Sequence, residues 1–303
     1  MIKIGIIGQG FVGGATRQGL ERHVETYTYD KFSKEKSNTT LEGVVTNANV
    51  IFVCVPTPMD MTEGGSASTS IVEEVVSEID EIAGEVGNNP TIVIKSTVPP
   101  GTTERINGTT SYCEVTFNPE FLTEANAVED FKNQNRIIIG TCDGYDAADV
   151  VSLFSSVFPG VPIKVVNSRE AEMCKYMINT FLSVKVSFAN EIYDLCQDND
   201  MDYDTVKDLA QLDTRLGSSH WMVPGPDGDR GFGGHCFPKD LNALCYVAAE
   251  SGTQVDVLKA ALHTNDRVRQ ERDWEAQEGR AVITGSGLNK PTAFRKLLEK
   301  IMG

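Results

Sequence analysis

Several features are scarce in this 303-residue sequence, and each scarcity argues against a class of protein. Basic side chains are few: 27 Lys and Arg face 43 Asp and Glu, a net charge of −16, and binding nucleic-acid phosphates needs clustered cations. No apolar run approaches the roughly 20 residues of a membrane-spanning helix. The first residues enter an apolar run with no basic segment or cleavage site, so no secretory signal is expected. We therefore expect a cytoplasmic protein without a nucleic-acid or membrane partner.

Patterns that bind metals or form disulfides are also missing. The four histidines have no ligand spacing, and we predict no metal site. The seven cysteines are odd in number, widely scattered and never in CxxC spacing. This favours reduced thiols over a disulfide framework or a zinc site.

The first half of the sequence has the pattern of an α/β domain. Short runs rich in Val and Ile alternate with longer polar, helix-compatible segments; the runs are 2–7, 50–55, 91–95 and 136–140. Continuous apolar character indicates strands that are buried on both faces. We predict a Rossmann-like, doubly wound parallel sheet.

The pattern changes near residue 168 to long helical periodicity. One helix is expected over nearly thirty residues from Ser168, with further helices near 203–212, 240–251 and 255–272. Segments 279–285 and 291–302 resemble one strand and one short helix. We therefore predict three parts: a dinucleotide-binding domain (1–166), a mainly helical central, dimerisation and catalytic domain (167–272), and a short C-terminal remnant (273–303).

A glycine motif indicates the dinucleotide site. Gly8, Gly10 and Gly13 form a GxGxxG that follows a strand and opens a helix at Phe11 and Val12. The first glycine permits the tight turn, the second lets the backbone approach a pyrophosphate, and the third allows close packing of helix on strand.

An acid follows the next expected strand. Asp30 lies 17 residues beyond Gly13, where a carboxylate accepts a hydrogen bond from a ribose hydroxyl and favours NAD over NADP. Lys31 and Lys34 lie nearby and could bind the 2′-phosphate of NADP, so NADP stays an alternative. The alternative is that the glycines are structural turn residues and Asp30 a solvated strand end.

Polar side chains gather in three further segments. Thr97 follows an expected strand, where open α/β sheets place ligands, and Glu120 and Glu124 follow another. Lys175 and Asn179 are four residues apart on the long helix and so share one face. Two of these signals have a plainer interpretation: Glu124 as a helix N-terminal acid, and the Lys175/Asn179 pair as exposed polar positions of an amphipathic helix.

One cysteine stands apart from the other six. Cys236 ends a glycine-rich loop and precedes Pro238, which suits the first turn of a helix. A thiol at a helix N-terminus near Lys239 is placed to form a nucleophilic thiolate. The plainer alternative is a small buried hydrophobe, the usual role of a free cysteine.

Together these segments resemble a known family. The motifs GQGFVG (8–13), KSTVPPGTT (95–103), NPEFLTEA (118–125), the Lys175/Asn179 pair and GFGGHCFPKD (231–240) are similar in order and spacing to those of the UDP-glucose/GDP-mannose 6-dehydrogenases. The resemblance extends over about residues 1–270. It implies oxidation of a sugar C6 alcohol to a carboxylate with two NAD+ per sugar, UDP-glucose being the first expectation.

The resemblance also assigns roles. The Cys236 thiolate traps the aldehyde as a thiohemiacetal, which is oxidised to a thioester and hydrolysed. Lys175 and Asn179 stabilise the oxyanion. Asp240 and Thr97 position the water, and Glu120 is the acid/base for hydrolysis.

Binding residues follow in the same way. For the cofactor, the resemblance implies Gly8, Gly10, Phe11, Val12, Gly13, Asp30, Val55, Pro56, Thr57, Pro58, Thr97 and Glu124. For the substrate, it implies Glu120, Phe121, Leu122, Glu124, Lys175, Asn179, Phe232 and Gly233. Arg215 resembles an arginine that reaches the neighbouring subunit's site, so a homodimer is expected; otherwise it is a solvated helix residue.

Three departures leave alternatives open. His235 replaces a small residue and either tunes the thiolate or, as we favour, points to solvent. The stretch 221–230 is longer than usual, so substrate contacts are not transferred there. The family's third, nucleotide-binding domain has no room after the last expected helix. A two-electron β-hydroxyacid dehydrogenase and a non-catalytic binding protein for NAD or a sugar nucleotide therefore stay as alternatives.

Overall fold

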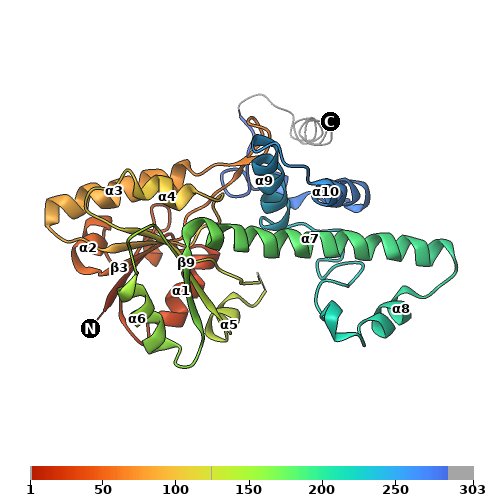
Figure 1. Cartoon of the computed structure of the whole chain (residues 1–303), viewed down its shortest axis with the longest axis horizontal. Coiled ribbons are helices and arrows are strands. Elements are labelled where there is room, and N and C mark those ends of the chain that lie inside the picture. The colour runs from red at the N-terminus through yellow and green to blue at the C-terminus, as the bar shows by residue number, and fades with distance from the viewer. Residues whose placement is uncertain (1, 124, 286–303) are drawn as a thin grey trace. The chain divides into compact units, whose positions relative to one another are not determined.

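The computed structural model describes residues 2–123 and 125–285 (Figure 1). The chain forms two compact units. Unit 1 is Met1–Thr57 with Thr69–Lys175, and unit 2 is Pro58–Ser68 with Tyr176–Gly303.

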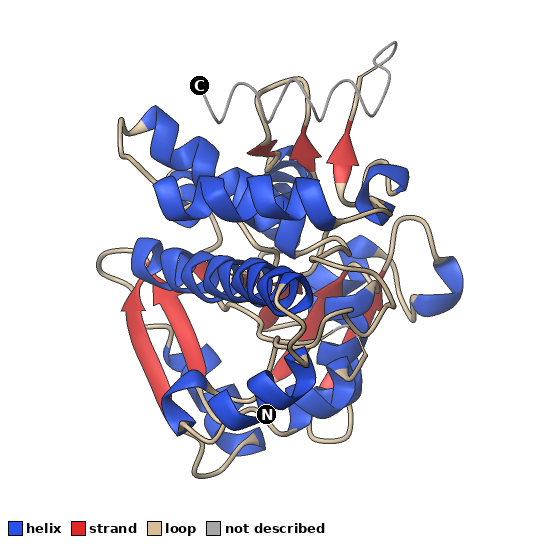
Figure 2. Ribbon diagram, turned by 90° about the vertical axis from the view of Figure 1, so that its right-hand side faces the viewer, coloured by secondary structure: helices blue, strands red, loops and turns tan. Residues whose placement is uncertain are grey.

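Unit 1 is built on a seven-stranded sheet, and Figure 2 shows strands in red and helices in blue. The strand order is β2 (Glu25–Tyr29), β1 (Lys3–Ile7), β3 (Val50–Val53), β6 (Thr91–Ile94), β7 (Val115–Phe117), β8 (Ile137–Thr141) and β9 (Ile163–Asn167). Ile4 pairs with Thr26 on one side and with Val50 on the other, both in parallel register. The strand order reverses between β1 and β3, and doubly wound folds bind ligands outside the carboxyl ends of the strands at such a point.

Two layers of helices cover the two faces of this sheet (Figure 1). One face packs on α2 (Leu41–Asn47), α3 (Ser70–Val86) and α4 (Thr102–Asn107). The other packs on α1 (Phe11–Leu20), α5 (Ala127–Lys132) and α6 (Ala148–Val157). The doubly wound prediction is confirmed, because the Val- and Ile-rich strands β3 and β6 are buried at every residue.

One pairing departs from a purely parallel sheet. β7 and β8 pair antiparallel, at Phe117 and Gly140, whereas β8 and β9 pair in parallel. An apolar run reports burial and not direction, so the sequence could not reveal this reversal.

Helix α7 (Ser168–Asp198) runs for 31 residues, and its first two turns belong to unit 1. Ala171 is buried in the core with α2 and α3. Glu172 is fully buried and accepts hydrogen bonds from the backbone N–H groups of Gly101 (2.5 Å) and Thr103 (2.8 Å). Burial raises the pKa of this carboxyl. These contacts are why the units divide after Lys175 and not at the expected boundary of residue 166.

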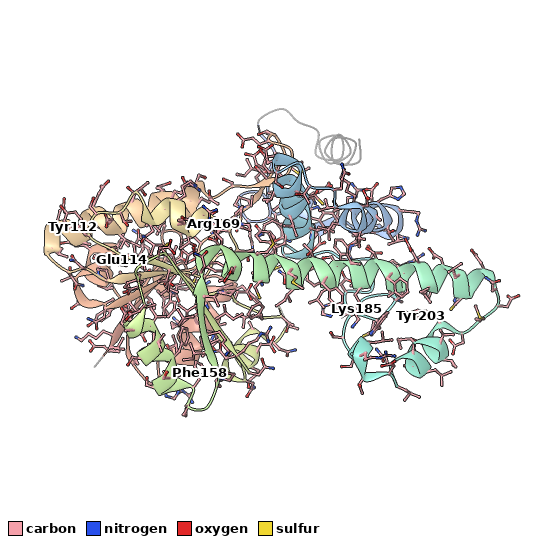
Figure 3. The ribbon with its side chains drawn as sticks, in the orientation of Figure 1. Tyr112, Glu114, Phe158, Arg169, Lys185 and Tyr203 are labelled. Atoms are coloured by element: carbon pink, nitrogen blue, oxygen red, sulfur yellow. The ribbon has the colours of Figure 1, made fainter. Side chains whose placement is uncertain are left out.

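Unit 2 is mainly helical. Its elements after α7 are α8 (Tyr203–Ala210), the 3₁₀ turn η2 (Thr214–Leu216), α9 (Phe237–Glu250), α10 (Asp256–Val268) and the 3₁₀ turn η3 (Asp273–Ala276). Tyr203 donates to the carbonyl of Trp221 (2.6 Å), and the Lys185 ammonium lies 4.6 Å from the Trp221 ring; Figure 3 labels Lys185 and Tyr203.

A small sheet completes unit 2. β4 (Met59–Asp60) pairs with β5 (Ser66–Ala67) and with β10 (Val282–Ile283). Met59 and Val282 share a core with Trp274 of η3. Segment 58–68, expected in the first domain, and the described part of the expected C-terminal remnant therefore belong to unit 2.

The C-terminal segment forms less regular structure than expected within the described residues. The strand expected over 279–285 is reduced to the two residues of β10, and the helix expected over 291–302 lies outside the described residues. Within 2–123 and 125–285, no helix is both long and apolar enough to cross a bilayer.

Candidate active site

The glycine motif forms the turn between β1 and α1. Gly8 adopts φ +84°, and its N–H donates to the carbonyl of Tyr29 (2.9 Å). Gly10 is the N-cap residue of α1, so Phe11 and Val12 occupy the first turn. A Cβ on Gly13 would lie 1.8 Å from the carbonyl oxygen of Gly8. The turn therefore has the close helix–strand approach and the helix N-terminus that fit a dinucleotide pyrophosphate.

Three alanine substitutions separate packing from ligand approach in this turn. Gly13→Ala forces its Cβ into the Gly8 carbonyl, and we expect a loss of about 1–3 kcal/mol in the free energy of unfolding. Gly14→Ala is the matched control. A Cβ on Gly14 meets no described atom within 4 Å, so we expect the free energy of unfolding to stay the same or to rise by up to about 1 kcal/mol. Thermal unfolding measures both variants.

Gly10→Ala is the informative third variant. Its Cβ also meets no described atom within 4 Å, so stability is retained, but the added methyl occupies the space where a pyrophosphate approaches. NADH titration followed by fluorescence is expected to show weakened binding. Binding as tight as in the unmodified chain would contradict the pyrophosphate assignment.

Asp30 organises the loop after β2. Its Oδ2 accepts from the Gln9 N–H (2.7 Å), and its Oδ1 accepts from Phe32 (2.9 Å) and Ser33 (2.8 Å). Burial acts to raise the pKa of this carboxyl, but the three backbone donors outweigh burial and hold the pKa below its usual range. The carboxylate is therefore charged and fixed one hydrogen bond from the glycine turn.

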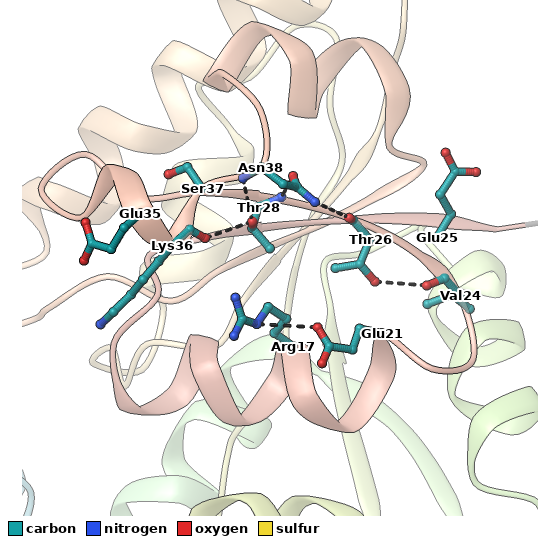
Figure 4. Close-up of a pocket in the computed structure, with 10 residues that line it drawn as sticks. All are labelled: Arg17, Glu21, Val24, Glu25, Thr26, Thr28, Glu35, Lys36, Ser37 and Asn38. Carbon is teal, nitrogen blue, oxygen red and sulfur yellow. Dashed lines mark hydrogen bonds and ion pairs between the residues drawn. The ribbon is translucent and has the colours of Figure 1, made fainter.

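Lys36 is a cation in contact with this turn, and the sequence interpretation overlooked it. Its Nζ donates to the carbonyl of Gln9 (3.3 Å), whereas Lys31 pairs with Glu74 on α3. Lys36 also lines a polar cavity of about 270 Å³ beside strand β2, where Arg17 and Glu21 of α1 form an ion pair (Figure 4). Since neither the glycines nor Asp30 line this cavity, it is separate from the dinucleotide turn.

Hydroxyl groups fix the loops after β3 and β6 to each other. Ser96 donates to the carbonyl of Val55 (2.6 Å) and accepts from its N–H (3.0 Å). Thr57 donates to the carbonyl of Thr97 (2.8 Å). The expected cofactor residues Val55, Pro56 and Thr57 are thus beside Thr97, whereas Pro58 begins the segment that belongs to unit 2.

Glu120 and Lys175 form a buried ion pair in unit 1. The ammonium lies 2.9 Å from Oε1 of Glu120 and 2.6 Å from its carbonyl oxygen, and both side chains are at least nine-tenths buried. The second carboxylate oxygen accepts from the Leu122 N–H (2.7 Å). The ring centroid of Phe121, the residue between Glu120 and Leu122, lies 5.6 Å from the Lys175 ammonium. The structure therefore brings two expected catalytic groups into direct contact.

Lys95 is a further buried charged residue of unit 1, and the sequence interpretation missed it. Its side chain is 3% exposed, and its Nζ donates to Oδ1 of Asn118 (2.7 Å). Burial lowers the pKa of this ammonium to about 8. The sequence signal for its burial is weak: Lys95 directly follows the apolar run Thr91–Ile94, but exposed lysines at ordinary strand ends occupy the same position.

In unit 2, Cys236 is the N-cap residue of α9, with Pro238 in the first turn as expected. The residue is partly exposed. Cys54 and Cys174 are partly exposed as well. Burial raises the pKa of the Cys113 and Cys245 thiols to about 12, which keeps them protonated. All seven cysteines lie within the described residues, and none forms a disulfide.

Asp240 lies one helical turn after Cys236 and is 1% exposed. Its N–H donates to the Cys236 carbonyl (2.8 Å), its Oδ2 accepts from Nδ2 of Asn179 (2.6 Å), and Lys239 forms an ion pair with its Oδ1. Asn179 and Asp240 are therefore joined directly. The Lys239 ammonium, which was expected near the thiol, forms its ion pair with Asp240.

The remaining candidates have varied surroundings. Phe232 is 4% exposed with its ring against Phe237, and its backbone N–H and carbonyl both bond to Asn265. Arg215 has an 87% exposed side chain that pairs with Asp213 two residues away. His235 is partly exposed, and its Nδ1 is buried.

Glu124 lies outside the described residues, so its expected place near the nicotinamide stays a prediction. Among the His, Cys, Asp and Glu side chains of the described segments, no group of three or more is arranged to hold a metal ion.

Comparisons with protein-family models identify both halves of the chain. Residues 18–158 match the NAD binding domain of the UDP-glucose/GDP-mannose dehydrogenase family, and residues 169–267 match the central domain of the same family.

Curated relatives agree. A UDP-glucose 6-dehydrogenase of Bacillus subtilis is 35% identical over 255 residues, which cover 82% of this chain and 55% of the relative. A UDP-glucose 6-dehydrogenase of Pseudomonas aeruginosa is 33% identical over 240 residues, which cover 76% of this chain and 51% of the relative. The chain thus spans about half the length of the curated relatives it matches.

Solved structures are similar over most of the chain. A UDP-glucose dehydrogenase of the archaeon Pyrobaculum islandicum is 30% identical with a TM-score of 0.75, covering 88% of this chain and 68% of that one. A GDP-mannose dehydrogenase of Pseudomonas aeruginosa is 27% identical with a TM-score of 0.63, covering 88% and 69%. The resemblance seen in the sequence motifs is confirmed: the chain belongs to the UDP-glucose/GDP-mannose dehydrogenase family, and carries its NAD-binding and central domains.

Proposed function

We propose that the chain oxidises the C6 alcohol of a nucleotide sugar to a carboxylate, with UDP-glucose as substrate and UDP-glucuronate as product. The observation that carries this proposal is Cys236 at the N-terminus of α9, partly exposed, one turn before the buried Asp240. UDP-glucose is chosen because the curated relatives described above are named for it.

The reaction removes four electrons, and two NAD+ molecules bound in succession would each take up one hydride. The first oxidation releases a proton and gives a C6 aldehyde. The Cys236 sulfur then adds to the carbonyl carbon, and the resulting thiohemiacetal is held while a second hydride leaves, which gives a thioester. Water replaces sulfur at that carbon, so the carboxylate departs and the thiol is restored.

The surrounding side chains support each step. Lys175 and Asn179, one helical turn apart on α7, supply a cation and an amide N–H donor for the oxyanion that forms when sulfur adds. Asp240 orients Asn179 through their 2.6 Å hydrogen bond, and with Thr97 positions the water. Glu120 takes the proton of that water during hydrolysis.

The cofactor contacts follow from the β1–α1 turn. Gly8, Gly10 and Gly13 receive the pyrophosphate, with Phe11 and Val12 in the first helical turn, and Asp30 accepts from the adenosine ribose. Val55, Pro56, Thr57, Pro58, Thr97 and Glu124 line the nicotinamide end. The substrate is held by Glu120, Phe121, Leu122, Glu124, Lys175, Asn179, Phe232 and Gly233.

A homodimer is part of the proposal, with Arg215 entering the neighbouring site. Support comes from the outer face of α7, where Met177, Phe181, Phe188 and Leu195 are each more than half exposed. The last three are spaced by seven residues, so they form one apolar stripe that a second copy can cover. Sedimentation velocity tests this directly, and a monomer at micromolar concentration would contradict the pairing.

We also propose the cytoplasm as the compartment, because free, reduced cysteines fit it.

The decisive experiment counts NADH formed per sugar with UDP-glucose, GDP-mannose and their amino-sugar relatives. Two NADH and a carboxylate product with one of these sugars are expected. One NADH per substrate would favour a two-electron dehydrogenase instead. Saturable binding without any NADH would favour a non-catalytic binding protein.

A further inference from the structure

The loop before the cysteine motif is anchored to the end of helix α10. Asp229, in the stretch 221–230 that is longer than usual for the family, accepts at Oδ2 from the N–H groups of Gln270 (3.1 Å) and Glu271 (2.8 Å). These two residues follow directly on Arg269, the C-cap of α10. The loop is therefore fixed at the point where α10 ends.

Arg269 lies at the centre of this anchor. Its side chain is 4% exposed and contacts three carboxylates: Asp227 (2.6 Å), Asp229 (3.4 Å) and Asp273 (3.3 Å). Its Nε donates to the carbonyl of Glu271 (2.7 Å). A buried guanidinium shared among carboxylates is held in one place, because its planar donors fit several acceptors at once.

The cysteine loop rests on the Arg269–Asp273 ion pair. The Gly234 N–H donates to the Asp273 carboxylate, at 3.0 Å and 3.2 Å from its two oxygens. A Cβ on Gly233 would lie 2.3 Å from Nη2 of Arg269 and 2.4 Å from Oδ1 of Asp273. Gly234 is two residues before Cys236, so the position of this ion pair determines the path of the chain into the nucleophile.

We propose that Arg269 and Asp273 are positioning residues that hold the glycine turn before Cys236, and that Asp227 and Asp229 lock Arg269 in place. The inference rests on the proposed function for the role of Cys236 as nucleophile. On this proposal, the long stretch 221–230 stabilises the cysteine loop, because its residues Asp227 and Asp229 contact the Arg269 guanidinium. Neither Arg269 nor Asp273 takes part in a chemical step.

Substitutions at Asp273 separate the hydrogen bond from the charge. Asp273→Ala removes both the acceptor for Gly234 and the partner of Arg269. Asp273→Asn keeps an acceptor oxygen for the Gly234 N–H. A displacement of about 1 Å costs an enzyme on the order of a hundredfold in rate, so we expect kcat of the alanine variant to fall by roughly 30- to 100-fold, with KM for NAD+ within about twofold. The asparagine variant is expected to recover most of the loss.

Hydrogen exchange supplies a readout that needs no turnover. In the full chain, the peptide containing Gly233 to Cys236 is expected to exchange faster in Asp273→Ala and near the original rate in Asp273→Asn. Lys207→Met is the matched control, since Lys207 also lies in unit 2 and forms a local ion pair with Asp204 (2.6 Å) on helix α8. It is expected to change neither exchange nor kcat.

The outcomes decide between the two proposals. Unchanged exchange in Asp273→Ala, or faster exchange with unchanged kcat, overturns the positioning role. If the unmodified chain oxidises no nucleotide sugar, the proposed function fails, and the exchange comparison alone decides whether the ion pair holds the loop. If Asp273→Ala does not fold, Asp227→Asn loosens Arg269 at a half-exposed residue and is expected to show a smaller loss of the same kind.

Discussion

Replacement of Cys236 by alanine is expected to abolish carboxylate formation, with a loss of at least about a thousandfold in turnover of the nucleotide sugar. Without the sulfur, the aldehyde has no covalent partner, and the second hydride has no thiohemiacetal from which to leave. At most one NADH per sugar is then expected. Absorbance at the NADH band, with product identified by mass spectrometry, measures both quantities. NADH affinity is expected to be retained, because the dinucleotide turn lies in unit 1.

Cys245→Ala is the matched control for this substitution. Cys245 lies on the same helix α9 but is 2% exposed, and burial raises the pKa of its thiol to about 12. Its loss is expected to lower the free energy of unfolding by about 1 kcal/mol and to leave the NADH stoichiometry unchanged. Two NADH per sugar from Cys236→Ala or Cys236→Ser at the original rate would contradict the covalent route.

The sequence was sufficient for the parts of the fold that are encoded locally. Runs such as Val50–Val53 and Thr91–Ile94 are apolar at almost every residue because both faces of their strands are buried, and this predicts a doubly wound sheet. The glycine spacing predicted the β1–α1 turn for a similar reason, since Gly13 has no room for a Cβ. Pro238 likewise marked the start of α9.

Non-local pairing accounts for most of what could not be predicted. β4 and β10 have two residues each, which is too short for a periodic pattern, and they lie more than 200 positions apart in the sequence. Their pairing nevertheless places segment 58–68 in unit 2. The buried partners of the site have the same character. Lys95 and Arg269 appear as ordinary polar residues in the sequence, and only the structure reveals their burial and their contacts.

Glu120→Gln is expected to give the second large effect, an enzyme that stops at the thioester. Glutamine cannot take a proton from water, so both hydrides leave but hydrolysis fails. One burst of NADH without steady turnover is expected. The intact mass of the chain is expected to rise by that of one substrate-derived acyl group, on the peptide that contains Cys236.

The same substitution tests the buried ion pair with Lys175. Removing the charge of Glu120 leaves an ammonium that is 3% exposed without its counter-charge, and breaking such a pair costs up to about 3–5 kcal/mol, less where the amide oxygen still accepts. Glu104→Gln is the matched control in unit 1: Glu104 pairs with Arg169 at the surface, where the loss is about 1 kcal/mol or less and no adduct forms. A Glu120→Gln chain that folds, turns over steadily and has no added mass would show that another group performs the hydrolysis, and would leave Glu120 only the role of holding Lys175.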